Sequence, residues 1–466
     1  MLIKFGTDGW RAIIAQEFTT ENVARVAYAT GLWVKSVNEK AGVVIGHDCR
    51  FGGPLFSETT AKVLCGQGIK VYMHKGICST PMVSLACKKL NTVAGVVITA
   101  SHNPPAYNGF KLKSNYGGPT TPADIAKVES MIPDKTEIPA TTLEEFQTQG
   151  LLEFVDLETM YYERVEKSFD MNAILNCGMI FGYDAMYGAG QKIVRRLLPQ
   201  NLVYLHCEEN PGFNGTAPEP LHKNLIEFSK VIKNATDIEF GFANDGDADR
   251  IGCYDNKGNF IDSHHVILLL IHYLHKYKNM TGKVAVSFTV SDKVKKLCNF
   301  YGIPIEVTKV GFKYICEIMV NEDVLLGGEE SGGIAIKGHI PERDGVWMAL
   351  TLMEFMAKTG KSIRELIDEV YAIVGAFDYD RYDLHISEEV KQKVISNCRN
   401  DVYKKFGTYS IQRREDIDGW KYFLDDNSWM MIRASGTEPV LRVYAESTTR
   451  EKVIDILEQT KATLLN

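Results

Sequence analysis

The sequence predicts an α/β protein that ends in a smaller α+β domain. Short β-branched apolar runs alternate with stretches of helical periodicity, which is typical of α/β folds. Many of these runs stop abruptly at a polar loop, and open α/β sheets bind ligands at that end of their strands. Beyond about residue 378 the apolar runs are joined only by turns, which indicates antiparallel strands.

The strands expected in the first part of the chain are Val43–Ile45, Val93–Thr99, Ile180–Tyr183, Phe240–Ala243, Val284–Phe288 and Val324–Leu326. A helix is expected over Gln191–Leu198, after a glycine-containing loop. Near the C-terminal end the expected strands are Lys421–Leu424, Trp429–Ile432 and Leu441–Ala445. The segment Thr448–Glu451 reads as a capping box before an amphipathic helix that ends near Leu465.

At about 150 residues per domain, a chain of 466 residues has room for three domains, or for four somewhat smaller ones. The pattern changes near residues 155, 258 and 378. We therefore expect α/β domains over residues 1–155, 156–258 and 259–377, and an α+β domain over residues 378–466. The same strand-then-loop order recurs in the first three, which is compatible with diverged copies of one domain.

Composition excludes several classes of function. A net charge of −7 argues against broad binding of nucleic acid or anionic lipid. The longest central apolar run, Val266–Ile271, is too short to span a bilayer, and the first residues contain no signal-length apolar segment. The ten cysteines contain no Cys-x-x-Cys pair. We expect reduced thiols, a cytoplasmic location and no membrane or nucleic-acid partner.

The segment NDGDADR, residues 244–250, places three carboxylates close together, at Asp245, Asp247 and Asp249. Like charges at this spacing need a cation or a cluster of strong hydrogen-bond donors, and small intervening residues let the backbone curl so that the oxygens converge on one ion. Hard oxygen ligands suit Mg²⁺. Arg250 stands where an EF-hand loop needs glycine, which excludes that motif. The alternative is a solvated acidic turn, but the motif directly follows an apolar run, and this favours a metal site.

Two further loops carry clusters of polar groups. RASGTEP, residues 433–439, offers a guanidinium, two hydroxyls and a flexible turn, which are the donors that a phosphate dianion binds. GGEESGG, residues 327–333, presents carboxylates and a hydroxyl that can bind sugar hydroxyls. Taken alone, the first motif is equally compatible with an ordinary polar turn, and the second favours a tight turn with one exposed acid. The P-loop and dinucleotide-binding glycine patterns are incomplete elsewhere in the chain.

The segment TASHNPP, residues 99–105, follows another apolar run. Ser101 lies at its end, His102 and Lys111 can move protons or supply charge, and the prolines stiffen the turn. No Asp–His partner for a hydrolase triad is evident. The alternatives are a capping serine in a simple turn, or a serine that carries a phosphoryl group beside the metal.

Taken together, the motifs resemble the α-D-phosphohexomutases, the phosphoglucomutase/phosphomannomutase group. The resemblance spans the chain and rests on FGTDGWR (5–11), TASHNP (99–104), DGDADR (245–250), GEESGG (328–333) and RASGTEP (433–439) in that order. It implies three related mixed α/β domains and a C-terminal TATA-binding-protein-like α+β domain around a central cleft.

The resemblance also implies roles for single residues. Metal ligands would be Asp245, Asp247, Asp249 and a phosphate oxygen on Ser101. Catalytic and supporting residues would be Arg11, Ser101, His102, Lys111, Arg250 and His339, with Lys111 the first choice as general acid or base. Substrate would contact Lys309, Gly311, Glu329, Ser331, Arg433, Ser435, Gly436 and Thr437.

The implied reaction interconverts hexose 1-phosphate and hexose 6-phosphate through a phosphoserine enzyme. The expected cofactors are Mg²⁺ and glucose 1,6-bisphosphate as activator and intermediate. Glu330 and Gly333 favour glucose or mannose phosphates over glucosamine phosphate. A phosphoglucosamine mutase, a metal-dependent sugar phosphatase and an inactive sugar-phosphate sensor are the alternatives. A monomer or a homodimer is expected.

Overall fold

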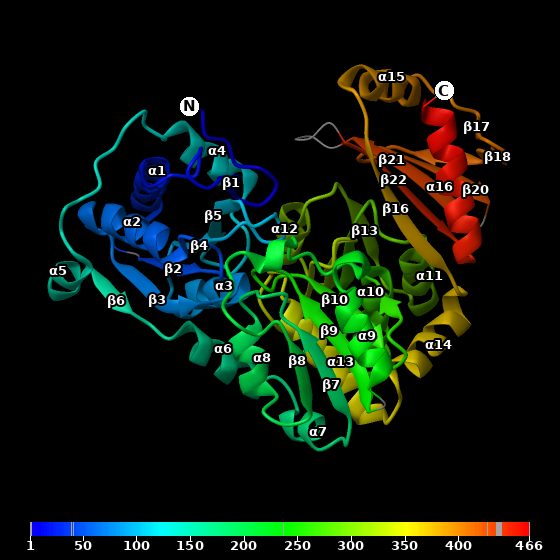
Figure 1. The fold of residues 1–466 in the computed structure, drawn as a ribbon, viewed down its shortest axis with the longest axis horizontal. Coiled ribbons are helices and arrows are strands. Elements are labelled where there is room, and N and C mark those ends of the chain that lie inside the picture. The colour runs from blue at the N-terminus through cyan, green and yellow to red at the C-terminus, as the bar shows by residue number, and fades with distance from the viewer. Residues whose placement is uncertain are drawn as a thin grey trace. The chain divides into compact units, whose positions relative to one another are not determined.

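The computed structural model describes residues 2–38, 40, 42–235, 237–425, 427–434 and 440–465 (Figure 1). By its internal contacts the chain divides into two compact units. The first contains Met1–Ala285 and Gly311–Ile367, and the second contains Val286–Val310 and Asp368–Asn466. Three α/β segments and one α+β segment follow one another along the chain, as the sequence predicts.

The first α/β segment contains a six-stranded sheet in the order β1-β5-β4-β2-β3-β6. Its elements are β1 (Trp10–Ile13), α1 (Thr20–Asn38), β2 (Val43–His47), α2 (Gly53–Gly66), β3 (Val71–Ile77), α3 (Thr80–Lys89), β4 (Ala94–Ile98), β5 (Tyr107–Ser114), α4 (Pro122–Ser130), α5 (Leu143–Thr148) and β6 (Leu152–Phe154). The central strands β4, β2 and β3 are parallel, whereas β5 is antiparallel to both of its neighbours, β4 and β1.

Strands β2 and β4 are apolar throughout because helices cover both of their faces. Val43 and Ile45 pack into the core formed with α1 and α2. On the other face, Gly46 and Gly95 let α3 approach closely, since a Cβ at either position would lie 2.8 or 2.9 Å from a methyl group of Val83. The close packing of α3 fixes the position of its first residues beside the candidate site.

The second α/β segment contains a sheet in the order β11-β10-β9-β7-β8. Its elements are α6 (Leu157–Glu166), α7 (Met171–Leu175), β7 (Ile180–Asp184), α8 (Gln191–Leu197), β8 (Leu202–Leu205), η1 (Phe213–Gly215), η2 (His222–Asn224), α9 (Ile226–Asn234), β9 (Ile238–Asn244), β10 (Ile251–Asp255) and β11 (Phe260–Ile261). Strands β8, β7 and β9 are parallel, and β9 turns back into antiparallel β10 through the acidic segment 245–250.

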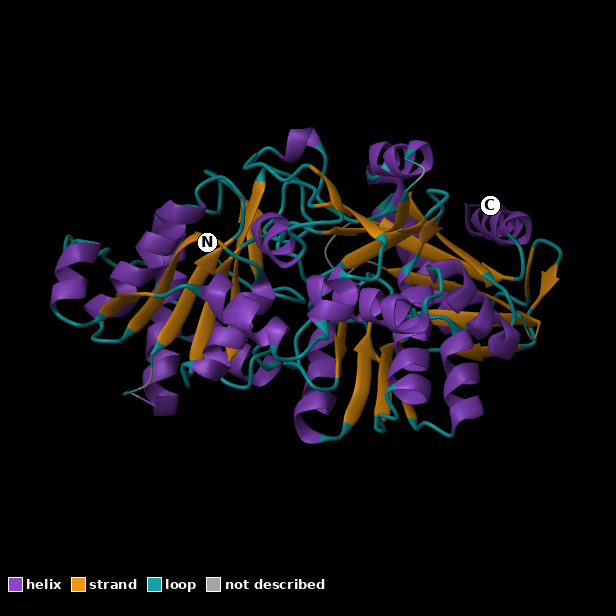
Figure 2. Cartoon of the chain, turned by 90° about the horizontal axis from the view of Figure 1, so that it is seen from below, coloured by secondary structure: helices purple, strands orange, loops and turns teal. Residues whose placement is uncertain are grey.

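The third α/β segment supplies the predicted sugar loop between β14 and β15, which pair in an antiparallel manner. Figure 2 shows the helices, strands and loops of the whole chain in different colours. The elements of the third segment are α10 (Ser263–His272), η3 (Tyr273–Tyr277), β12 (Lys283–Ser287), α11 (Asp292–Tyr301), β13 (Ile305–Thr308), α12 (Phe312–Asn321), β14 (Val324–Gly328), β15 (Ile334–Ile336), α13 (Gly345–Thr359) and α14 (Ile363–Val374).

The α+β segment contains an antiparallel sheet in the order β16-β22-β21-β20-β19. Its elements are β16 (Asp378–His385), α15 (Glu388–Arg399), β17 (Lys405–Phe406), β18 (Tyr409–Ser410), β19 (Arg413–Glu415), β20 (Trp420–Asp425), β21 (Ser428–Ala434), β22 (Val440–Ser447) and α16 (Arg450–Leu465). Met430 and Ile432 pack with α16, while Trp429 and Met431 face the other side, as strand alternation requires.

Each strand predicted from the sequence is present, within one or two residues of its expected bounds. The predicted helix after Gly190 is α8. One cap differs from the prediction. The last helix begins at Arg450, and Thr449 caps it by accepting a hydrogen bond from the Lys452 N–H at 3.3 Å, so the expected box from Thr448 to Glu451 is wrong by one residue.

Candidate active site

The acidic segment 245–250 curls so that three carboxylates converge. Asp245, Asp247 and Asp249 are fully buried, and one ligand oxygen from each lies within 4.8 Å of the others. The turn is tight because Asp245 Oδ1 accepts hydrogen bonds from the backbone N–H groups of Asp249 and Arg250, each at 3.0 Å. Ala248 adopts a left-handed backbone with φ of 57°. The sequence therefore places three acids in one buried cluster, hereafter the aspartate cluster.

Cations from two other segments neutralise part of this charge. Lys111 on β5 is fully buried, and its Nζ lies 2.7 Å from Asp247 Oδ2, 3.1 Å from Asp249 Oδ2 and 2.8 Å from Asp8 Oδ2. The guanidinium of Arg343 lies 2.7 Å from Asp249 Oδ2 and also pairs with Asp8. The cluster is thus held between β5 and the residues that precede α13.

The protonation of the cluster is uneven. Burial, reinforced by the charges of Asp249 and Asp247, raises the pKa of Asp245 well above its usual range. Burial alone would raise the pKa of Asp247 too, but its ion pair with Lys111 lowers it. Burial alone would lower the pKa of Lys111, but the charges of Asp247, Asp249 and Asp8 keep it above its usual value. Asp245 consequently holds its proton more firmly than Asp247 does.

The cluster fits a divalent cation. Among the described residues, the buried oxygens Asp247 Oδ1 and Asp249 Oδ1 accept no hydrogen bond. An unpaired buried carboxylate oxygen is costly unless a cation binds it. Three carboxylate ligands in one octahedral site are the hard oxygen set that Mg²⁺ accepts. Thr80, the first residue of α3, donates its hydroxyl to Asp247 Oδ2 at 2.5 Å and so orients this ligand.

Ser101 lies against the aspartate cluster. It follows β4 with a left-handed backbone, φ 52°, and its Oγ donates to Asp245 Oδ2 at 2.6 Å. His102 Nδ1 is 3.3 Å from the same Oγ. Burial, and then the charge of Arg250, keeps the pKa of His102 well below its usual value, which favours the neutral ring. Arg11 on β1 donates to Asn103 Oδ1 at 2.6 Å, beside the serine.

The predicted sugar loop is attached to the aspartate cluster through the backbone. Ile251 donates its N–H to the carbonyl of Gly332 at 3.1 Å, and Arg250 forms a β-bridge with Gly333. Glu329 is nearly buried, and its Oε1 accepts the Gly311 N–H at 2.8 Å. Ser331 is half-exposed. Two predicted substrate residues, Glu329 and Gly311, therefore lie together.

His339 lies in a different environment from the other predicted residues. Its Nε2 contacts Asp344 Oδ2 at 2.9 Å, its ring stacks on Trp347 at 3.6 Å, and Tyr161 donates to the same Asp344. Asp344 in turn caps α13. This arrangement gives His339 a role in orienting the carboxylate that caps α13.

The predicted phosphate loop lies in the second unit. Ser435, Gly436 and Thr437 are outside the described residues. Arg433 Nε donates to Asp418 Oδ2 at 3.2 Å, and the same oxygen accepts the Val310 N–H at 3.0 Å. The exposed Lys309 adjoins Val310. Asp418 thus brings two residues predicted to contact substrate, Arg433 and Lys309, to one region of this unit.

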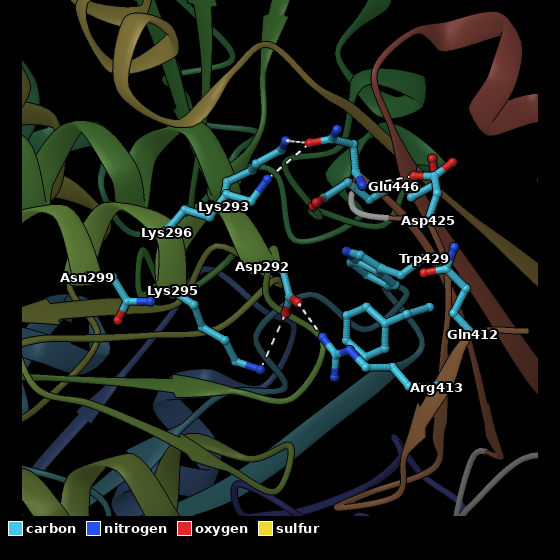
Figure 3. A pocket seen from close by; sticks show the side chains of 13 residues that line it. Asp292, Lys293, Lys295, Lys296, Asn299, Gln412, Arg413, Asp425, Trp429 and Glu446 are labelled. Carbon is cyan, nitrogen blue, oxygen red and sulfur yellow. Dashed lines mark hydrogen bonds and ion pairs between the residues drawn. The ribbon is translucent and has the colours of Figure 1, made fainter.

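A separate hollow of about 190 Å³ also lies in the second unit, between α11 and the strands β19 to β22 (Figure 3). Several of its polar side chains contact one another. Lys293 and Lys296 donate to Asn427 Oδ1 at 3.2 and 3.0 Å, and Asp292 pairs with Lys295 and Arg413. None of the described residues predicted to bind substrate or metal lines it, so it is distinct from the candidate active site.

Sequence reasoning missed several members of the site. Asp8 belongs to a noted motif but had no assigned role, and its carboxylate binds both Lys111 and Arg343. Arg343 and Thr80 lie in segments without a recognisable motif. Glu342 pairs with the buried Lys113 at 2.8 Å and likewise belongs to no recognisable sequence motif. Only the fold reveals these residues, because their partners are remote along the chain.

Comparison with known proteins gives matches along the whole chain. Family models of phosphoglucomutase/phosphomannomutase α/β/α domains I, II and III match residues 2–138, 159–258 and 262–374, and the C-terminal domain model matches residues 389–462. A phosphoglucomutase/phosphomannomutase of Thermococcus kodakarensis is 31% identical over 97% of this chain and 96% of its own.

Other relatives differ in their named substrate. A phosphoglucosamine mutase of Oceanobacillus iheyensis is 28% identical over 98% of both chains. A crystal structure from Thermus thermophilus, provisionally assigned as a phosphomannomutase, aligns with a TM-score of 0.89 and 32% identity over 100% of both chains.

Among the described residues, no helix combines the length and apolar character needed to cross a bilayer.

Proposed function

The chain belongs to the phosphoglucomutase/phosphomannomutase family, and we propose that it interconverts the 1- and 6-phosphates of glucose or mannose. Members of this family are isomerases that move a phosphoryl group within a hexose phosphate. The observation that carries the proposal is the position of Ser101, whose Oγ donates to Asp245 of the aspartate cluster at 2.6 Å.

Ser101 is the proposed phosphoryl carrier. In the first half-reaction the P–Oγ bond breaks and a bond forms between phosphorus and the free hydroxyl of the substrate, giving a hexose 1,6-bisphosphate. In the second, the phosphoryl group at the other end of the sugar returns to Oγ. Asp245, Asp247 and Asp249 would hold Mg²⁺ together with a phosphate oxygen. When bound, this cation would neutralise charge on the transferred group.

Lys111 is the proposed general acid and base at Nζ. Its Nζ lies within 3.1 Å of carboxylate oxygens of Asp247 and Asp249. When these carboxylates hold Mg²⁺ they would attract the ammonium proton less, which would favour the neutral amine that a general base needs. In its neutral form Nζ would accept the proton of the attacking sugar hydroxyl in the first half-reaction. In the second it would give a proton to the oxygen at the other end of the sugar, from which the phosphoryl group departs. His102, neutral and 3.3 Å from Oγ, is the second candidate.

The remaining residues would bind the sugar and its resting phosphate. Glu329 and Ser331 would accept and donate hydrogen bonds to sugar hydroxyls beside Gly311. Arg11 and Arg250 would contact the phosphoryl group near Ser101. Lys309 and the loop 433–437 would bind the phosphate that is not reacting, because guanidinium and ammonium groups bind phosphate dianions strongly.

Coupled assays with glucose, mannose and glucosamine 1-phosphates test the proposal. We expect turnover with glucose 1-phosphate or mannose 1-phosphate, because the residues Glu330 and Gly333 of the sugar loop favour these substrates over glucosamine phosphate. Relatives of similar identity include a phosphoglucosamine mutase, so turnover with glucosamine 1-phosphate alone would replace the proposed substrate. Release of inorganic phosphate from every sugar without isomerisation would indicate a phosphatase.

Further proposals concern the whole protein. We propose domain boundaries at residues 155, 258 and 377, supported by the breaks between the family-model matches. A cytoplasmic location is supported by the ten free cysteines, the state that a reducing compartment maintains. Glucose 1,6-bisphosphate is the proposed activator, since it can phosphorylate Ser101. Size-exclusion chromatography distinguishes the two proposed states, a monomer and a homodimer.

A further inference from the structure

The segment that carries Ser101 is bound through its backbone carbonyls by one buried arginine. Arg50 is 2% exposed, and its guanidinium donates four hydrogen bonds to four different backbone carbonyls. One terminal nitrogen binds the carbonyls of Ser101 at 2.7 Å and Asn103 at 2.6 Å, and the other binds those of Pro104 and Tyr107 at 2.9 Å each. Arg50 thus contacts most of the segment 101–107, which is here called the serine loop.

Arg50 is itself held in place by Asp48. The Arg50 N–H donates to Asp48 Oδ1 at 2.9 Å, its Nε lies 3.4 Å from Asp48 Oδ2, and both side chains are fully buried. Thr99 joins this pair to the serine: its hydroxyl donates to Asp48 Oδ2 at 2.5 Å, and its Oγ1 accepts the Ser101 N–H at 2.9 Å. Two chains of contacts therefore run from Asp48 to Ser101, one through Arg50 and one through Thr99.

We propose that Arg50 is a positioning residue that keeps the phosphoryl-carrying Ser101 aimed at the aspartate cluster. Ser101 has a positive φ of 52°, a conformation that residues with a side chain rarely adopt unless surrounding contacts enforce it. The four hydrogen bonds from Arg50 supply that enforcement. They also turn four carbonyl oxygens toward the guanidinium. These oxygens then point away from the phosphoryl group on Ser101, whose negative charge they would otherwise repel.

The inference deepens the proposed function and rests on Ser101 being the phosphoryl carrier. It predicts a specific defect. A serine loop that is less firmly held leaves the phosphoserine misaligned with the sugar hydroxyl, and misplacement by about 1 Å can slow a reaction about 100-fold. Water needs no such alignment. Loss of Arg50 should therefore slow transfer to sugar much more than hydrolysis of the phosphoserine.

Arg50→Lys is the direct test, because lysine keeps the charge but has one nitrogen and cannot reach four carbonyls. Thr99→Val removes the second chain of contacts with little change in volume, and it serves if the lysine variant does not fold. Arg25→Lys is the matched control. Arg25 is also a buried arginine of the first α/β segment, and its Nε donates to the Pro133 carbonyl at 2.6 Å, away from the serine loop.

The measurement is the ratio of inorganic phosphate released to hexose 6-phosphate formed, together with kcat and KM, on protein phosphorylated by glucose 1,6-bisphosphate. Wild type and Arg25→Lys should give the same low ratio. Arg50→Lys should lower kcat about 100-fold, leave KM within a few-fold and raise the ratio at least about 10-fold. Thr99→Val should also lower kcat and raise the ratio. If Ser101 is phosphorylated in wild type but both variants behave like Arg25→Lys, the positioning role is overturned. If wild type never carries phosphate on Ser101, the proposed function itself fails.

Discussion

Thr80→Val tests whether the aspartate cluster is a metal site that neighbouring side chains organise. The change removes the hydroxyl that donates to Asp247 Oδ2 at 2.5 Å and keeps the shape of the side chain. The Thr80 backbone N–H still binds the Asp247 carbonyl at 3.0 Å, so the loop itself should stay in place. The variant therefore isolates the orientation of one carboxylate.

The size of the effect follows from the charge of the acceptor. A hydrogen bond to a charged group contributes about 1.5–3 kcal/mol. Lys111 still binds the same oxygen at 2.7 Å, which places the loss toward the lower end of that range. About 1.4 kcal/mol corresponds to a tenfold change in an equilibrium constant, and outer contacts of metal ligands typically change metal affinity by about 10- to 100-fold. We expect the Kd for Mg²⁺ to rise about 10- to 30-fold.

Calorimetric titration of Mg²⁺ into the purified protein measures this Kd directly, and the Mg²⁺ dependence of turnover provides a second readout. Thr60→Val is the control, since the buried Thr60 hydroxyl donates to an uncharged helical carbonyl, that of Phe56, at 2.8 Å. Sugar KM at saturating Mg²⁺ should be unchanged in both variants. An unaltered Mg²⁺ affinity in Thr80→Val would refute the reasoning.

Three further predictions follow from charges and contacts at other positions. Asp247→Asn removes a charged ligand and should lower turnover by at least about 100-fold in folded protein, while wild type should lose activity in chelator and regain it with Mg²⁺; full activity in chelator would exclude the metal site. Burial raises the pKa of Glu446 from 4.5 to about 7, so the folded second unit keeps a proton that the unfolded chain releases. Its stability should fall by up to about 3 kcal/mol as the pH rises between those values, and hydrogen exchange in β20–β22 should show that Glu446→Gln removes this fall. His339→Gln should lower the melting temperature, because Asp344 loses a partner, yet keep kcat within a few-fold; a loss of kcat near 100-fold would instead make His339 catalytic.

The parts of the fold that the sequence predicts are those with a local signal. Buried parallel strands such as β2 and β4 are continuous apolar runs, and they are visible without any partner. Strand β5 was not predicted because Lys111 and Lys113 interrupt its apolar pattern. Both lysines are fully buried, which is possible only because Asp8, Asp247 and Glu342 pair with them from other segments.

The candidate site divides in the same way. Asp245, Asp247 and Asp249 are adjacent in the sequence, so their convergence could be expected from spacing alone. By contrast, no sequence motif marks Arg343, Thr80 or Arg50. Their importance comes from the approach of α3 across glycine positions and from the packing of α13 against the strands of the second sheet. Such tertiary relations have no local signature.

The central claim is that Ser101 carries the phosphoryl group that is exchanged with the sugar. Intact-mass and peptide analysis of the purified enzyme, combined with phosphate and product measurements during turnover of glucose 1-phosphate, tests it most directly. We predict phosphate on Ser101, loss of mutase activity in Ser101→Ala with the fold retained, and far less inorganic phosphate than glucose 6-phosphate, because a mutase shields its phosphoserine from water. One inorganic phosphate released for each glucose 1-phosphate consumed, with no glucose 6-phosphate formed, would contradict the claim.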